Sequence, residues 1–171
     1  GSRVAAIGQA FEMPVIAWSQ NLDAARAAEL GVLAVSKAEL FSRADVVTIH
    51  LRLSDRTIGL GGAAELAAMK PTAVLVNTSR GPIVSEDALL AALEAGTIAG
   101  AGLDVFSQEP LPSDNPLWKT KNLTIFSHLG GYSQGYEDRA MPTIAGNMGK
   151  FLAGDLKSMI NIVRKPASWK D

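Results

Sequence analysis

The chain has 171 residues, enough for one ordinary domain with a sizeable core. Hydrophobic residues make up 47% and charged residues 19%, which is typical of folded globular proteins and excludes a largely disordered chain. With 16 basic and 17 acidic residues the formal net charge is -1, so no broad basic field attracts nucleic acid or anionic lipid. The chain has no cysteine, which excludes disulfides and thiolate metal sites and fits a cytoplasmic location.

The first predicted element is a helix over residues 1–11, in which Val4, Ile7 and Phe11 are spaced to form one buried face. A short β-branched run over 14–18 predicts a buried strand directly after it. The apolar runs of the chain are far too short to cross a bilayer, so no membrane partner is expected.

An Ala-rich helix is predicted over 23–30, and Gly31 is a typical residue to end it. Ser36 and Glu39 have the spacing of a capping box, which opens another short helix. The run over 46–50 then predicts one of the clearest strands.

A second clear strand is predicted over 74–77. Ahead of it, the glycines of 59–62 resemble a phosphate loop but follow a polar turn, so we expect them to begin a helix. An amphipathic helix is predicted over 85–95, with Ser85 as its N-cap and Gly96 as its stop.

Two more strands are predicted over 103–106 and 123–126, with a proline-rich loop between them and a long helix over 135–153 after them. Short strands that alternate with helices indicate an α/β fold with a parallel sheet and crossover helices. In such sheets ligands bind at the carboxyl ends of the strands, so functional side chains are expected just after strands.

Three polar residues lie after predicted strands, although each has a plain structural interpretation as well. Arg80 can hold a carboxylate through two parallel hydrogen bonds, or can lie in a surface turn. Glu109 can pair with a histidine, or can be a solvated loop residue. His128 is the natural proton donor near neutral pH, whereas His50 is expected to pack or to form a structural hydrogen bond. Together, Arg80, Glu109 and His128 suit proton transfer to an oxygen next to a carboxylate.

Five segments resemble the D-isomer-specific 2-hydroxyacid dehydrogenases in order and spacing, namely 65–71, 75–82, 100–106, 109–111 and 128–130. The resemblance covers nearly the whole chain and implies a Rossmann-like, doubly wound parallel sheet. It also implies an oxidoreductase that transfers hydride between NAD and a small 2-oxo or 2-hydroxy acid. The family implies a homodimer as well, and no metal site is expected.

The resemblance also implies roles for individual residues. Arg80 corresponds to the arginine that binds the substrate carboxylate near the nicotinamide, and His128 to the general acid and base. Glu109 corresponds to the partner that orients the imidazole, and Asp104 to the acid that contacts the nicotinamide carboxamide. The other residues implied at the cofactor site are Gly1, Ser19, Thr57, Thr78, Ser79 and Gly130.

Some residues depart from the family pattern. Of the G-x-G-x-x-G fingerprint only the last glycine is present, as Gly1, so we expect a domain without its first strand and without the separate substrate domain. On this basis residues 1–154 form a partial dinucleotide-binding domain and 155–171 a C-terminal tail. No acidic residue occurs in 19–21, so NAD is favoured but NADP is not excluded. Ser127 and Arg52 stand where the family commonly has proline.

Two alternatives stay open at the level of sequence. One is an NAD(H)-sensing binding protein of the kind found among transcriptional corepressors related to this family. The other is a fragment without activity of its own, in which case the predicted function belongs to a longer protein.

Overall fold

The computed structural model describes residues 1–162 of the chain. The chain divides into two compact units, Gly1–Gly130 and Gly131–Asp171. The predicted division at residue 154 stays a prediction, and residues 163–171 of the predicted tail lie outside the described part.

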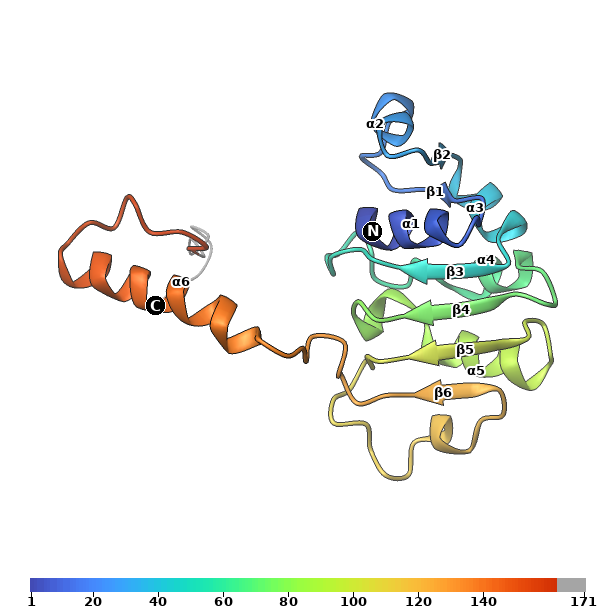
Figure 1. The fold of residues 1–171 in the computed structure, drawn as a ribbon. Coiled ribbons are helices and arrows are strands. Elements are labelled where there is room, and N and C mark those ends of the chain that lie inside the picture. The colour runs from blue at the N-terminus through green and yellow to red at the C-terminus, as the bar shows by residue number, and fades with distance from the viewer. Residues whose placement is uncertain (163–171) are drawn as a thin grey trace. The chain divides into compact units, whose positions relative to one another are not determined.

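The first unit contains parallel strands in two sheets (Figure 1). The larger sheet has four parallel strands in the order β3-β4-β5-β6, and in the smaller sheet β1 pairs with β2. The strands are β1 (Ile16–Ala17), β2 (Leu33–Ala34), β3 (Val46–Ile49), β4 (Val74–Asn77), β5 (Gly100–Leu103) and β6 (Leu123–Ile125). The helices of this unit are α1 (Ser2–Ala10), α2 (Ala24–Glu29), α3 (Lys37–Arg43), α4 (Ala63–Ala68) and α5 (Glu86–Glu94), with 3-10 turns at Gly81–Ile83 and Pro116–Lys119. The prediction of an α/β fold with a parallel sheet is confirmed.

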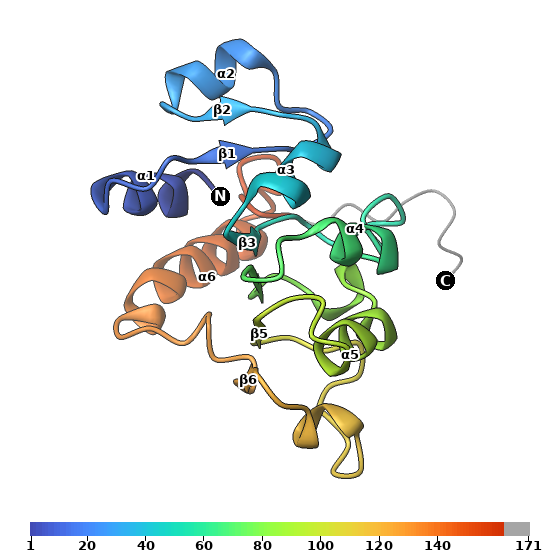
Figure 2. The same ribbon diagram turned by 90° about the vertical axis from the view of Figure 1, so that its right-hand side faces the viewer.

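The core of the first unit lies between the four-stranded sheet and helices α4 and α5, which cover one face of it (Figure 2). Leu75 of β4 and Leu89 of α5 are fully buried, and Leu66 of α4 is almost so. Burial of such side chains contributes about 1.5–3 kcal/mol each. The packed sheet therefore holds in place the strand ends from which the loops at its carboxyl edge begin.

Several helix ends follow the predicted capping signals. The Ser36 hydroxyl accepts a hydrogen bond from the Glu39 N–H, and the Glu39 carboxylate accepts from the Ser36 N–H, which completes the capping box. Gly62 precedes α4, and the Glu65 carboxylate accepts from its N–H at 3.0 Å. The glycines of 59–62 thus begin a helix, as expected.

Three predictions for the first unit were wrong. The strand predicted as buried over 14–18 is β1, whose two residues are only half-buried. The strand predicted over 103–106 lies instead at Gly100–Leu103, because the small residues of β5 pair with strands on both sides although glycine is a poor strand former. On α1 the expected buried face is exposed, with Phe11 75% exposed. The buried residue of this helix is Gly8, where an added Cβ would lie 3.2 Å from the Val15 side chain.

The second unit is formed around α6 (Tyr136–Leu152), which confirms the helix predicted over 135–153. Gly135 precedes α6 with a left-handed backbone, and Ala153 ends it. Across residues 1–162, no helix has the length and hydropathy needed to cross a membrane.

Candidate active site

The loops after β4, β5 and β6 carry the three residues that were predicted as a catalytic set. Arg80 follows β4, Glu109 lies in the loop after β5, and His128 follows β6. Because these three strands are parallel neighbours, their carboxyl ends meet at one edge of the sheet.

The loop that carries Arg80 is fixed by a buried amide. Asn77 is 1% exposed; its Nδ2 donates to the Arg80 carbonyl at 3.0 Å and its Oδ1 accepts from the Ser79 N–H at 3.1 Å. At Gly81, an added Cβ would lie 1.9 Å from the backbone carbon of Phe106. The backbone after Arg80 is thus packed directly against the loop that leads to Glu109.

Glu109 and His128 form a hydrogen-bonded pair. His128 Nδ1 lies 2.7 Å from Glu109 Oε2, and Glu109 Oε1 accepts from the Phe106 N–H at 2.9 Å. The hydrogen bond from His128 lowers the pKa of Glu109 below its ordinary value of 4.5; the Phe106 N–H and the nearby Arg80 charge act in the same direction, against partial burial. The Glu109 carboxylate is therefore ionised at neutral pH, and it leaves Nε2 as the ring nitrogen available to a substrate.

A second carboxylate lies beneath the His128 loop. Asp104 directly follows β5 rather than lying within a strand, and it is 4% exposed. Its carboxylate accepts from the N–H groups of Leu129 and Gly130, both at 2.7 Å. Asp104 and Gly130, both predicted at the cofactor site, thus bind each other.

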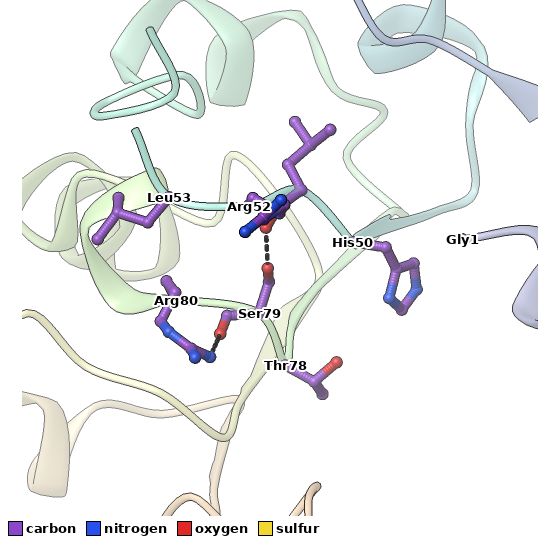
Figure 3. A pocket seen from close by; sticks show the side chains of 8 residues that line it. Gly1, His50, Arg52, Leu53, Thr78, Ser79 and Arg80 are labelled. Atoms are coloured by element: carbon purple, nitrogen blue, oxygen red, sulfur yellow. Dashed lines mark hydrogen bonds between the residues drawn. The ribbon is translucent and has the colours of Figure 1, made fainter. Parts of the chain in front are cut away.

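A cavity of about 540 Å³ opens beside Arg80 (Figure 3). Its lining contains two arginines and no acidic residue, and comprises Gly1, His50, Leu51, Arg52, Leu53, Thr78, Ser79 and Arg80. The Ser79 hydroxyl donates to the Leu51 carbonyl, and Arg80 Nη1 donates to the Ser79 carbonyl at 2.6 Å. Such a lining favours an anionic ligand.

Four of the predicted cofactor residues therefore line one cavity, namely Gly1, Thr78, Ser79 and Arg80. The other four, Ser19, Thr57, Asp104 and Gly130, are outside this lining. Ser19 follows β1 in the smaller sheet, and the Thr57 hydroxyl accepts from the Ser54 N–H at 2.8 Å within its own turn. For all eight predicted residues, a cofactor contact stays a prediction.

Sequence reasoning assigned no site role to Asn77 or His50. Asn77 was readable as a polar residue at a strand end, but its burial depends on the packed loops around it. His50 forms the expected hydrogen bond, to the Thr48 hydroxyl at 2.9 Å, yet its ring also lines the cavity on the side of Gly1 and Thr78 (Figure 3). Desolvation lowers the pKa of His50, so its ring is neutral at neutral pH.

Within residues 1–162, no group of three or more histidine, aspartate or glutamate side chains is arranged to hold a metal ion.

The chain is similar to several known proteins. It is 42% identical over 154 residues to a glyoxylate reductase of Aeropyrum pernix, an alignment that covers 90% of this chain and 46% of the relative. A D-isomer specific 2-hydroxyacid dehydrogenase of Lactobacillus delbrueckii ssp. bulgaricus, solved in its NAD-complexed form, has a TM-score of 0.77 and 30% identity over 90% of this chain and 50% of that one. Another such dehydrogenase from Xanthobacter autotrophicus Py2, solved with NADPH and MES, has a TM-score of 0.72 and 35% identity over 89% of this chain and 61% of that one.

The chain spans about half the length of the curated relatives it matches. Residues 1–130 match the family described as "D-isomer specific 2-hydroxyacid dehydrogenase, NAD binding domain", which coincides with the first compact unit. The family that the sequence motifs indicated is thereby confirmed, and the chain belongs to the NAD-binding domain family of the D-isomer specific 2-hydroxyacid dehydrogenases.

Proposed function

We propose that the full-length protein interconverts a 2-oxo acid and a D-2-hydroxy acid with NAD(H) or NADP(H). The observation that carries this proposal is the His128–Glu109 pair, joined at 2.7 Å, on the same sheet edge as Arg80. An acid–base pair beside a cation that binds carboxylates suits a substrate with a carbonyl next to its carboxylate.

Arg80 is proposed to bind the substrate carboxylate. Its Nη1 is engaged by the Ser79 carbonyl, which holds the side chain, and it forms no salt bridge with any acid among residues 1–162. The remaining N–H groups of the guanidinium can grip both oxygens of a carboxylate.

His128 is proposed to donate the proton. When bound, the nicotinamide cofactor supplies a hydride, which forms a C–H bond at C2 of the oxo acid. The Nε2–H of His128 gives its proton to the carbonyl oxygen as the C=O π electrons move onto that oxygen. Glu109 holds Nδ1–H and stabilises the charged imidazole before the transfer. In the reverse direction, neutral Nε2 accepts the hydroxyl proton.

The cavity beside Arg80 fits the cofactor chemically. Gly1 at the N-terminus of α1 lines it, and this helix has no side-chain cap, so its first N–H groups suit a phosphate. Arg52 and Arg80 add positive charge. We propose NAD as the cofactor; because no acid occurs in 19–21 to repel a 2′-phosphate, we propose that NADP is also accepted.

Steady-state assays of the full-length protein test this function. We expect oxidation of NADH or NADPH in the presence of glyoxylate, hydroxypyruvate, pyruvate or a bulkier 2-oxo acid. Absence of oxidation with every pair would overturn the proposal. If that absence came with tight binding of NADH, an NAD(H)-sensing binding protein would replace it. The homodimer implied by the family and the cytoplasmic location expected from the lack of cysteine stay predictions.

The lowered pKa of Glu109 predicts where activity is lost in acid. A carboxyl group with a lowered pKa stays ionised as the pH falls, so protonation of Glu109 should reduce kcat/KM only below pH 4.5. Profiles of kcat/KM from roughly pH 4 to roughly pH 8 check this for the unmodified protein and for Glu109→Gln. Glu94→Gln, at an exposed helix position, is the matched control. An acid limb above pH 4.5 that disappears in Glu109→Gln, but not in the control, would contradict the prediction.

A further inference from the structure

Asp104 is a buried residue whose carboxylate forms hydrogen bonds with the loop of His128. Its two oxygens accept from consecutive backbone N–H groups, those of Leu129 and Gly130, each at 2.7 Å. The carboxylate is 4% exposed, and burying such a group is costly unless donors surround it. Here the donors belong to the two residues that directly follow the general acid.

The same residue also holds the preceding peptide group. The Asp104 carbonyl accepts from the His128 N–H at 2.8 Å, so three successive N–H groups bond to one residue. His128 itself has a φ of 56°, a left-handed conformation that is uncommon for a residue other than glycine. A backbone of this kind persists only where its surroundings hold it, and Asp104 is in place to do so.

Gly130 shows how closely the loop approaches the carboxylate. An added Cβ at this position would lie 2.8 Å from Asp104 Oδ2. A side chain there would force the buried carboxylate to move. A substitution at Gly130 therefore disturbs the same contact without changing the charge of Asp104.

We propose that Asp104 is a positioning residue, whose carboxylate sets the place of the His128 ring relative to Glu109 by holding the Leu129 and Gly130 N–H groups. The proposal rests on the proposed function for the role of His128 in turnover, but not for the anchoring of the loop. A contact with the nicotinamide carboxamide is a separate role for the same group, and the experiment distinguishes the two.

Asp104→Asn in the full-length protein is the principal test. Asparagine keeps the size of the side chain, but it replaces one acceptor oxygen by an NH₂ group that would face a backbone N–H. We expect kcat to fall roughly 10- to 100-fold, the range for loss of a hydrogen bond to a charged group, with the Kd of NADH changed less than about 2-fold. Asp114→Asn, in an exposed loop, is the matched control and should leave both values unchanged.

Histidine NMR of the cofactor-free protein reports the environment of the His128 ring and does not depend on turnover. The ring resonance of His128, assigned by its absence in His128→Asn, should move in Asp104→Asn and in Gly130→Ala, and stay in place in Asp114→Asn. The shift in the double variant should be less than the sum of the two single shifts, because both changes disturb one contact. If Asp104→Asn does not fold, Gly130→Ala carries the test.

An unmoved His128 resonance in the variants would overturn the positioning role, even in a protein that shows no turnover. Unchanged kcat with a clearly raised Kd for NADH in Asp104→Asn would likewise overturn it, and would assign the carboxylate to cofactor binding.

Discussion

Replacement of His128 by asparagine is expected to lower kcat for reduction of a 2-oxo acid by roughly 10²- to 10⁴-fold, the usual contribution of a general acid. Asparagine tolerates the left-handed φ of 56° found at this position, so the backbone change is small. Asparagine has no imidazole Nε2–H that could give its proton to the carbonyl oxygen. Steady-state kinetics and NADH titration of the full-length protein measure the two effects separately.

The control for this variant measures the effect of placing asparagine at a residue with a left-handed backbone, separately from the loss of the imidazole. Glu12 has a φ of 59° and lies exposed after α1, so Glu12→Asn makes the same kind of substitution away from the sheet edge. We expect it to keep full turnover. A His128→Asn protein with kcat within a few-fold of normal would remove His128 from the mechanism.

Replacement of Arg80 by lysine is expected to lower kcat/KM roughly 10²- to 10³-fold although the positive charge is kept. An ammonium group cannot form two parallel hydrogen bonds to a carboxylate. Lysine also lacks the Nη1 group that donates to the Ser79 carbonyl, so this hydrogen bond is lost. Kinetics with a 2-oxo acid, compared with an aldehyde that lacks the carboxylate, isolate the effect.

The loss at Arg80 should be confined to the substrate that carries a carboxylate. Arg43→Lys is a suitable control, because Arg43 pairs with Glu39 at 3.8 Å on the surface of α3 and such pairs contribute little. Equal losses for the 2-oxo acid and the aldehyde would show that Arg80 does not bind the carboxylate.

Much of the fold was predictable because its signals are local. The runs that became β3 and β4 are rich in β-branched residues, and Ser36, Gly62 and Ser85 cap helices where the sequence indicated. β5 was misplaced because its glycines have a low strand propensity and its position is set by pairing with both neighbours. The exposed side chains of α1 likewise could not be foreseen, since helical spacing shows which residues share a face but not what covers it.

The grouping of the candidate residues at one sheet edge was predictable, but the contacts that support them were not. Arg80, Glu109 and His128 could be placed together because each follows a strand of one parallel sheet. The bonds of Asp104 to the His128 loop join residues 25 and 26 positions apart, so they depend on tertiary packing rather than on a local pattern. Asn77 was missed although its bonds to Ser79 and Arg80 are local, because its burial depends on the loops packed around it.

The transfer of deuterium from a labelled cofactor tests the proposed reaction most directly. The full-length protein would be supplied with NADH that carries deuterium at both C4 positions and with a 2-oxo acid that it turns over. We predict a D-2-hydroxy acid with a single deuterium at C2 and a hydroxyl proton from solvent. A product with only protium at C2 would contradict direct hydride transfer at the edge formed by Arg80, Glu109 and His128, and a product of the L configuration would contradict the proposed D specificity.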